Sequence, residues 1–590
     1  MPVIVDALRW PFLPLIESMR GYSVRKLRRD VVSAMTVSVV EIPQAMAYAL
    51  IAGVPPQYGI YTSIVQGTLG AIFSSSQHLT TGPTNTQSLL IAAAVSRLVS
   101  SDADPTLYLS LVFTLSVLKG LVQLGFFALR LSELVPFISR AVIFGISSGA
   151  GMLIISGQLP AFLGIPRGSS SPFYGIVGDL HRMVPHLGEV QASTVLVGVL
   201  TVVLAVGSRR ISRFVPGALL AVVVSATVVA LTGVPVKVVG RLDASLPTFQ
   251  IPPLDWASVT GLFSGALALA VLGSIETIAI AKSLGKRSGE RIAPDREVFG
   301  QGVSNLVGGL LQCMPATASF TRSALDHDAG GQTRFAAIFN AIFVGTIFFA
   351  LLDYARFIPY ASLSGVLFVV AWGLVETRYF LRLVRADRSD ATVFAATFLA
   401  TLLIPLQYAV FVGVFLNILF HLRTSSRLHI AEMVQTEGGA FLERPIFTRG
   451  GEKSIVFVQL EGDLFFAVAD QLQEQLESLR RAGVRIVILR LKRTHSIDAT
   501  VLDVLEEFAR RMREGGGHLL LCGVRPAVME TLRRFELARV IGADNIFAAG
   551  EKTFTSAQRA VRRARELLDR SIDTSHLRPG DLVDEIDFQI

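Results

Sequence analysis

Long apolar segments alternate with short polar loops from residue 31 to about residue 420. A helix needs roughly 20 apolar residues to cross the hydrocarbon core of a bilayer, and most of these segments are close to that length. The pattern predicts a polytopic α-helical membrane protein with fourteen spans, the first interrupted by Pro43. The expected spans are 31–52, 57–75, a short stretch after Pro83, 106–129, 134–157, 190–207, 214–233, 257–282, 297–313, a short stretch after Pro315, 335–352, 361–376, 390–404 and 406–422.

A different pattern follows residue 425, where charged residues become frequent and short apolar runs alternate with amphipathic stretches. Alternating strands and helices of this length predict a small α/β domain. The expected strands are 454–460, 484–490 and 518–522, with helices at 467–482 and 500–514. The expected organisation is a cytoplasmic segment at 1–29, a transmembrane domain at 30–424, a linker at 425–451, the α/β domain at 452–565 and a tail at 566–590.

Composition and charge support this division. Only 17% of the residues are charged and mean hydropathy is +0.54, whereas a soluble protein carries about 25% charged residues. The net charge of +8 comes with basic residues in short loops, which is typical of cytoplasmic loops and not of nucleic-acid binding. We therefore expect a lipid bilayer and no nucleic acid as partner. The arrangement predicts an inner-membrane protein with both termini in the cytoplasm.

The two halves of the membrane domain share an internal interval. Pro43 and Pro83 are 40 residues apart, and Glu276 and Pro315 are 39 residues apart. Each interval joins a polar interruption in the first span of a half to the proline that opens its third. Seven spans per half reverse the orientation of the second half, so the sequence predicts a 7+7 inverted repeat. Short, proline-interrupted segments at matching places are the best sequence pointer to a transporter's binding site.

The segments after Pro83 and Pro315 are candidates for an anion site. A helix that begins inside the membrane leaves several N–H groups without partners and carries about half a positive charge at its N-terminus. Hydroxyl and amide donors accompany these starts at Thr84, Asn85, Thr86, Thr317 and Ser319. The alternative is that proline and threonine only kink packed helices. Two matched segments favour the binding site.

Ionisable residues inside apolar spans usually have a function. Arg322, expected two turns into the tenth span, either helps to hold an anion or pairs with a buried acid. Glu276, near the centre of the eighth span, is expected to take a proton or a cation, or to balance an arginine. Glu41 is a second buried acid, for which a functional and a structural role remain equally open. Lys119 and Arg140 lie nearer to span ends, where they can reach the interface, and are not assigned.

The sequence contains no recognisable motif for catalysis or for binding a metal or a nucleotide. Its two cysteines, Cys313 and Cys522, fall in different domains and support neither a disulfide framework nor a metal site. No nucleophile or nucleotide motif is found, so we expect no enzyme, no catalytic residue, no metal and no cofactor.

Residues 42–50 (IPQAMAYAL) and 53–61 (GVPPQYGIY) resemble the signature of the SulP sulfate permeases, a family of anion transporters. Residues 82–85 (GPTN) and 318–323 (ASFTRS) are similar to the two half-helix motifs of that family. The end of the chain resembles a STAS domain. The resemblance covers nearly the whole sequence, and the signature around Pro43 is long enough to be specific.

The resemblance implies a core unit (spans 1–4 and 8–11) that moves against a gate unit (spans 5–7 and 12–14), a homodimer and elevator-type transport. By motif match, the implied anion-binding residues are Gln44, Tyr48, Thr84, Asn85, Thr86, Thr317, Ala318, Ser319, Phe320, Thr321 and Arg322. Glu276 matches the acid of the eighth span, for which proton or sodium coupling is proposed in bacterial members. A sodium-coupled member would need oxygen ligands around this acid, and Thr277 and Thr317 could supply them.

The STAS domain departs from the regulators it resembles at one position. Stand-alone STAS regulators carry a phosphorylatable serine directly after an aspartate, whereas this chain has Ala499 after Asp498. Phosphorylation at this position is excluded. Asp498 and Thr500 are instead expected to cap the second helix of the domain.

The sequence as a whole predicts a secondary active transporter of sulfate-like oxyanions, driven by protons through Glu276. Sodium-dependent bicarbonate uptake and dicarboxylate transport are the alternatives within transport. A membrane sensor that signals through the STAS domain is an alternative of another class, although a sensor has no need of two opposed half-helices with Glu276 and Arg322 between them.

Overall fold

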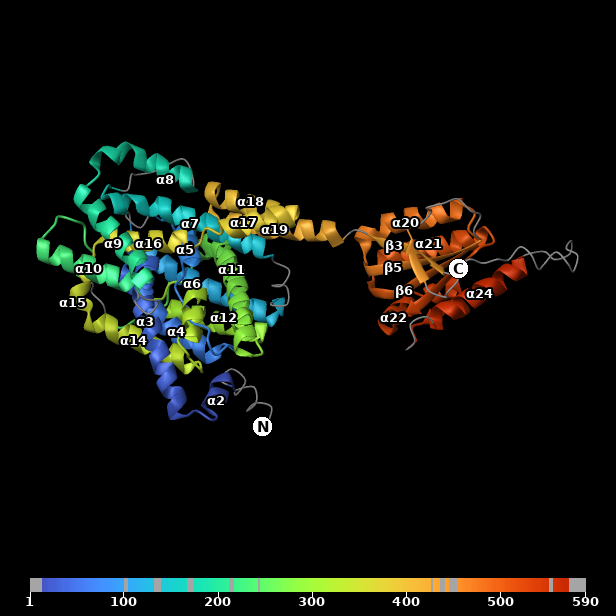
Figure 1. Cartoon of the computed structure of the whole chain (residues 1–590), viewed down its shortest axis with the longest axis horizontal. Helices are drawn as coiled ribbons and strands as arrows, with labels where there is room; N and C mark the ends of the chain where they lie inside the picture. The colour runs from blue at the N-terminus through green and yellow to red at the C-terminus, as the bar shows by residue number, and fades with distance from the viewer. Residues whose placement is uncertain are drawn as a thin grey trace, which may run out of the picture. The chain divides into compact units, whose positions relative to one another are not determined.

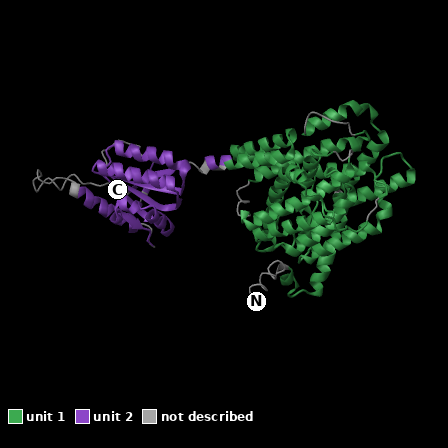
Figure 2. Ribbon diagram, turned by 180° about the vertical axis from the view of Figure 1, so that it is seen from behind, with its two compact units in different colours: residues 1–418 green, residues 419–590 purple. Residues whose placement is uncertain are grey.

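A computed structural model describes most of the chain, which divides into two compact units, Met1–Ile418 and Leu419–Ile590 (Figure 2). The described residues are 13–99, 104–131, 139–166, 175–211, 217–241, 245–425, 428–435, 441–444, 454–550 and 555–571. Residues 1–12 of the expected cytoplasmic segment and 572–590 of the expected tail therefore lie outside the description. Each unit is considered by itself below.

The first unit is helical (Figure 1). Its helices are α2 (Leu13–Met19), α3 (Val24–Ile51), α4 (Pro56–Phe73), α5 (Asn85–Val95), α6 (Pro105–Ala128), α7 (Arg140–Leu163), α8 (Gly175–Met183), α9 (Ala192–Ile211), α10 (Gly217–Thr232), α11 (Trp256–Ser288), α12 (Pro294–Leu310), α13 (Phe320–Asp328), α14 (Phe335–Ala350), α15 (Leu352–Ala355), α16 (Tyr360–Trp372), α17 (Thr377–Ala386), α18 (Arg388–Leu403) and α19 (Leu406–Ser425), with a short 3₁₀ helix, η2 (Val184–Glu189). Each expected span corresponds to a helix. By length and composition, five helices of the described chain could cross a membrane: α3, α6, α7, α11 and the stretch Tyr360–Ala386.

One local expectation was wrong. Pro43 does not interrupt the first span, because α3 continues through it from Val24 to Ile51. A proline removes one backbone hydrogen bond, and packing on neighbouring helices lets a membrane helix tolerate the loss. Between the expected spans, residues 158–189 contain α8 and η2, and the segment after residue 376 contains the amphipathic helix α17. The apolar faces of α8 and α17 are too short for either helix to be predicted as a membrane span from the sequence.

The helices of this unit pack in two groups that each combine both halves of the sequence. In the first group, α3 packs against α4, α13 and α14, while α6 packs against α11 and α12. In the second group, α7 packs against α16 and α18, and α9 packs against α10 and α16. Contacts of α3 with α10 and α16, and of α5 with α7, join the groups. The first group contains both segments with the candidate anion-binding residues.

The second unit is an α/β domain built on a six-stranded sheet in the order β4-β3-β5-β6-β7-β8. The neighbours from β5 to β8 are parallel, and β3 is antiparallel to both β4 and β5. The strands are β3 (His429–Gln435), β4 (Phe441–Arg444), β5 (Ile455–Leu464), β6 (Ile486–Ile497), β7 (His518–Val524) and β8 (Ile546–Ala548). The remaining elements are α20 (Phe466–Arg481), α21 (Ala499–Glu514), α22 (Pro526–Arg534), α23 (Leu537–Ile541), η3 (Ala543–Asn545) and α24 (Thr555–Ser571).

Both faces of this sheet are covered, as expected where parallel strands read as continuous apolar runs. Val458, Leu489 and Leu521 lie side by side in register and face α20, α21, α22 and α23. Their neighbours in sequence face the other side, where α24 packs (Figure 1). Two strands, β3 and β4, fall in the range 425–451 that was expected to be a linker. That boundary was wrong because these strands pair with β5 and belong to the sheet.

Candidate functional site

The two proline-containing segments meet in a short antiparallel ribbon. Its strands are β1 (Thr81–Gly82) and β2 (Thr317–Ala318), with Thr81 opposite Ala318 and Gly82 opposite Thr317. The Ser319 N–H extends the ribbon by donating to the Thr80 carbonyl at 3.0 Å. Because the ribbon is antiparallel, α5 and α13 leave it from opposite ends. Two segments more than 230 residues apart in sequence are thus joined where their helices begin.

The second half-helix begins later than the sequence suggested. The helix was expected directly after Pro315, but Thr317 and Ala318 are extended in β2 and α13 starts at Phe320. Strand pairing uses the backbone groups that a helix would need, which explains the shift. Arg322 consequently lies in the first turn of α13, and the expectation that it lies two turns into the span was wrong.

Neither half-helix has a side-chain cap. Thr84 and Ser319 occupy the N-cap positions of α5 and α13, but neither side chain accepts a hydrogen bond from its helix. By contrast, Ser23, Asp104 and Asp255 cap α3, α6 and α11. The first N–H groups of α5 and α13 therefore keep their positive partial charge available for another acceptor.

The beginning of α5 also carries unpartnered polar groups. Thr84 and Asn85 are 7% and 9% exposed, yet Thr84 Oγ1 and Asn85 Nδ2 have no hydrogen-bond partner. Buried polar atoms nearly always have a partner, so each exception calls for a ligand or a water. Gln44 and Tyr48 are buried on α3, which packs against α5, and Thr86 is buried at the start of α5. The residues predicted on α3 and α5 lie together.

The predicted residues of the second segment are less uniform. Thr317 and Ala318 are buried in β2, and Ser319 is partly buried. Phe320 is 57% exposed and Thr321 is also exposed. Both side chains are therefore accessible, and the start of α13 also offers its backbone N–H groups to an anion.

Arg322 is paired with an acid. Its Nη1 lies 3.2 Å from Glu41 Oε1, and both side chains are 0% exposed. Nη2 of the same arginine donates to the Pro83 carbonyl at 3.0 Å, and Asn340 Nδ2 donates to Glu41 Oε2 at 2.6 Å. A Cβ at Gly82 would lie 2.9 Å from Arg322 Nη2, so this position must be glycine for the pair to fit. Arg322 therefore links α13 to α3 and to the extended segment before α5. We call this segment the first crossover and the extended segment before α13 the second crossover.

Glu276 and Thr277 lie on α11, beside the ribbon. Their helix packs against α5, which carries Thr86, and against α6, which carries Lys119. The Thr277 hydroxyl lies 3.0 Å from that of Thr317, which in turn donates to the Gly273 carbonyl at 2.9 Å. The structure thus brings together Glu276, both threonines and the start of α5. Lys119, which the sequence interpretation left unassigned because it lay near a span end, is 0% exposed.

Polar side chains from neighbouring helices satisfy the backbone of both crossovers. Asn305 on α12 bonds both the N–H and the carbonyl of Ala316, at 2.9 and 3.0 Å. Glu297 accepts from the N–H groups of Ser75 and Ser76, at 2.9 and 2.8 Å. Extended backbone inside a membrane requires such partners. Sequence reasoning missed Asn305 and Glu297, although polar residues in an apolar helix were an available signal.

A cavity of about 830 Å³ opens between the two helix groups. Its lining includes the end of α3 at Leu50, Gln158 on α7 and Tyr360 on α16. Lys237 and Arg241, both exposed, also line it and give it positive charge. A basic rim of this kind raises the local concentration of anions.

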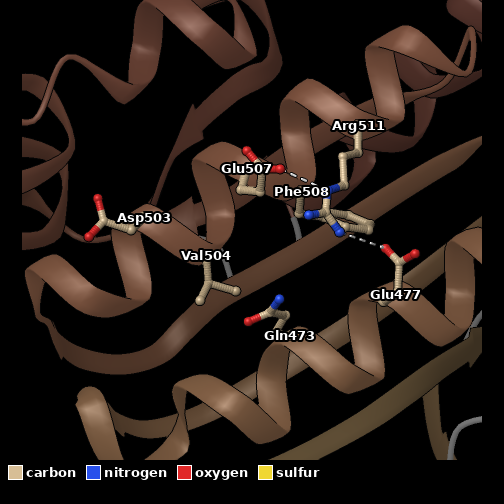
Figure 3. Close-up of a pocket in the computed structure, with 7 residues that line it drawn as sticks. All are labelled: Gln473, Glu477, Asp503, Val504, Glu507, Phe508 and Arg511. Atoms are coloured by element: carbon tan, nitrogen blue, oxygen red, sulfur yellow. Dashed lines mark hydrogen bonds and ion pairs between the residues drawn. The ribbon is translucent and has the colours of Figure 1, made fainter.

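The STAS-like domain has a groove of about 200 Å³ between α20 and α21 (Figure 3). It is lined by Glu477, Asp503 and Glu507, and the guanidinium of Arg511 is engaged by Glu507 at 2.8 Å. A hydrogen bond from Arg480 holds the pKa of Glu477 below its usual value, so this carboxylate stays ionised. The groove is therefore unsuited to an anion.

Asp498 caps α21 as predicted, accepting from the Val501 N–H at 2.9 Å. Thr500 does not share this role, because it already lies inside the helix. Ala499, which stands where regulators carry serine, is the first residue of α21.

Comparisons with known proteins agree with this arrangement. The sulfate permease family model matches residues 27–397, and the STAS domain model matches residues 450–559. A putative sulfate transporter, YvdB of Bacillus subtilis, is 27% identical over 90% of this chain and 97% of its own length. The chloroplastic sulfate transporter 4.1 of Arabidopsis thaliana is 29% identical over 92% of this chain and 81% of its own length.

Solved structures show the same fold. The murine Solute Carrier 26 family member A9 anion transporter, in an inward-facing state, superposes with a TM-score of 0.85 at 18% identity, covering 95% of each chain. The transmembrane domain of the cyanobacterial bicarbonate transporter BicA superposes with a TM-score of 0.60 at 22% identity, covering 67% of this chain and 98% of that domain. The chain therefore belongs to the sulfate permease family of multi-pass membrane transporters and carries a STAS domain after its membrane domain.

Proposed function

We propose that the protein is a secondary active transporter that moves sulfate-like oxyanions across the inner membrane, with the anion held between the starts of α5 and α13. The observation that carries this proposal is the pair of uncapped helix starts, joined by the β1–β2 ribbon, with buried and unpartnered atoms at Thr84 and Asn85. Backbone N–H groups at helix starts bind anions in many proteins. The matched relatives of Bacillus subtilis and Arabidopsis thaliana are named as sulfate transporters, which favours sulfate over other oxyanions.

The N–H groups of α5 and α13 would attract the anion, and Thr84, Asn85 and Ser319 would orient it. Gln44 and Tyr48 on α3 would complete the site. Arg322 would add positive charge to this site. Its Nη2 donates to the Pro83 carbonyl and its Nη1 lies beside Glu41, while Nε and Nη1 have no hydrogen-bond partner and would be available to an anion.

Proton coupling through Glu276 is supported by its position. Glu276 lies on α11, which packs against α5, where Thr84 Oγ1 and Asn85 Nδ2 have no hydrogen-bond partner. Protonation of Glu276 would therefore change the charge beside the proposed anion site, which is what a coupled transporter needs. An enzymatic function is excluded by membership of a transporter family.

Movement of one helix group against the other would expose the site to each side of the membrane in turn. The division into two packed groups supports an elevator mechanism, since both half-helices belong to one group and can move as a body. The basic cavity beside Lys237 and Arg241 would form an entrance. A homodimer, fourteen spans in two inverted repeats and cytoplasmic termini complete the proposal.

Uptake into proteoliposomes tests this function. The purified full-length protein would be supplied with labelled sulfate, bicarbonate or fumarate, each with and without an inward proton gradient and an inward sodium gradient. We expect sulfate uptake that the proton gradient accelerates. Uptake of bicarbonate or fumarate alone would replace sulfate by that substrate, and the absence of any uptake would contradict a transport function.

A further inference from the structure

Lys119 on α6 is a fully buried cation whose contacts are oxygen atoms of both crossovers. Its Nζ donates to Gln87 Oε1 on α5 at 2.7 Å and to the Ala316 carbonyl, just before β2, at 2.5 Å. The side chain is 0% exposed. A lysine without any access to water is rare and needs strong compensation for the lost hydration. Its acceptors come from the two segments that build the proposed anion site.

Glu276 is the acidic residue of α11, and α11 packs against α6, which carries Lys119. Gly273 lies one turn before Glu276 and makes room for the ammonium. A Cβ at Gly273 would lie 3.2 Å from Lys119 Nζ, 3.3 Å from Thr317 Oγ1 and 3.4 Å from Gln87 Nε2. Lys119, Gln87 and Thr317 therefore converge at this point of α11.

Few other charges lie on the elements packed around these two residues. Within its described residues, α6 has no charged side chain besides Lys119, and α5 has none at all. The acids and bases of α12 lie in its first turn, from Asp295 to Glu297. The basic residues of α11 lie beyond Ala281, towards its end. On these elements, Glu276 is thus the acid nearest to Gly273 along the chain.

The two groups that accept from Lys119, a carbonyl and an amide oxygen, are also ligands that hard metal cations prefer, and Glu276 lies one turn beyond Gly273 on the same helix. We infer that the ammonium group of Lys119 permanently occupies a cation position beside Glu276, so that the protein has no sodium site there and a proton is the ion left to couple transport. The assignment of the coupling ion rests on the proposed transport function. The occupancy of the cation position by the ammonium does not.

Removal of the ammonium should open the position to a small cation. Lys119→Ala would leave the Gln87 amide oxygen and the Ala316 carbonyl without the ammonium, close to Gly273 and one turn before Glu276 on α11. A lysine that served only to fasten the crossovers would leave a damaged protein with no preference among cations. The response to cations therefore separates the two roles.

The experiment compares wild type, Lys119→Ala and the control Lys282→Ala, which removes an exposed lysine from α11. Thermal unfolding of each purified full-length protein would be followed in sodium, lithium and choline chloride at equal ionic strength. We expect the midpoint of Lys119→Ala to rise in sodium or lithium relative to choline, and those of the other two proteins to stay unchanged. Sulfate uptake by the wild type should be equal in sodium and choline.

Uptake by Lys119→Ala should fall about tenfold or more in choline, as expected for the loss of a charge-assisted hydrogen bond, and recover in part in sodium. A sodium requirement of the wild type, or a Lys119→Ala midpoint without any cation preference, would overturn the inference. Should Lys119→Ala not fold, the same unfolding series on Lys119→Met and Lys119→Ser decides: only the smaller serine should respond to sodium. Because unfolding does not require transport, failure of sulfate uptake alone would count against the proposed function and not against the occupied cation position.

Discussion

Glu41→Ala should destabilise the protein strongly, because it leaves the guanidinium of Arg322 buried without its counter-charge. Both side chains are 0% exposed, and arginine cannot lose its proton to escape the penalty. Breaking a buried ion pair by removing one partner costs about 3–5 kcal/mol. The hydrogen bond to the Pro83 carbonyl remains in the variant and places the expected loss at the lower end of this range.

The double variant Glu41→Ala/Arg322→Met should recover part of that loss. Replacement of a whole buried pair by apolar side chains is often neutral or stabilising. We therefore expect the double variant to be at least as stable as Glu41→Ala alone, with an interaction energy of about 1–3 kcal/mol in the mutant cycle. The non-additivity arises because the second substitution removes the charge that the first one left unpaired.

Equilibrium unfolding in mixed detergent and SDS, followed by circular dichroism, would supply the four free energies of unfolding. The exposed pair of Arg287 and Asp328, at 2.7 Å and about half exposed, provides the matched control. Its cycle should give only about 0.2–1 kcal/mol. The explanation for Arg322 would be refuted if the buried cycle were additive within about 0.5 kcal/mol, or if Glu41→Ala cost no more than the exposed control.

Four further outcomes are expected. Thr84→Val keeps shape but removes a hydroxyl from the proposed site, so KM for sulfate uptake should rise about tenfold, whereas an unchanged KM would exclude Thr84 from the site. Glu276→Gln should abolish acceleration by a proton gradient but keep sulfate exchange without a gradient; persistent acceleration would move coupling elsewhere. Replacing Lys237 and Arg241 together by Ala should raise KM several-fold at low ionic strength and not at about 0.5 M salt, and equal effects at both would exclude electrostatic attraction. Burial raises the pKa of the Cys522 thiol to about 12, so peptide mapping after iodoacetamide treatment at pH 8 should find it unmodified in the folded protein and modified after denaturation; rapid labelling of the folded protein would contradict its burial.

Sequence patterns determined the helices and the α/β domain because they depend on local periodicity. Apolar length places a helix at each expected span, and alternating strands and helices predicted β5, α20, β6, α21 and β7. The strands β3 and β4 were missed. The edge strand β4 is short, and β3 beside it carries several polar residues, so neither has a clear strand pattern apart from its pairing.

The matched positions of Pro83 and Pro315 were also readable from the sequence, and with them the beginning of α5 at Asn85. The beginning of α13 was not, because Thr317 and Ala318 are extended only through pairing with Thr81 and Gly82. That pairing joins segments that no local pattern connects, so only the tertiary structure decides it.

The partners of the buried charges were likewise beyond the sequence. It identified Glu41, Glu276 and Arg322 as residues that need a counterpart in an apolar span, because an isolated charge there is costly. It did not pair Arg322 with Glu41, and it left Lys119 unassigned. The sequence thus determined which charges require compensation, while packing of α6 against α11 and of α13 against α3 decided which group compensates each, because partners are chosen by distances that only the folded chain defines.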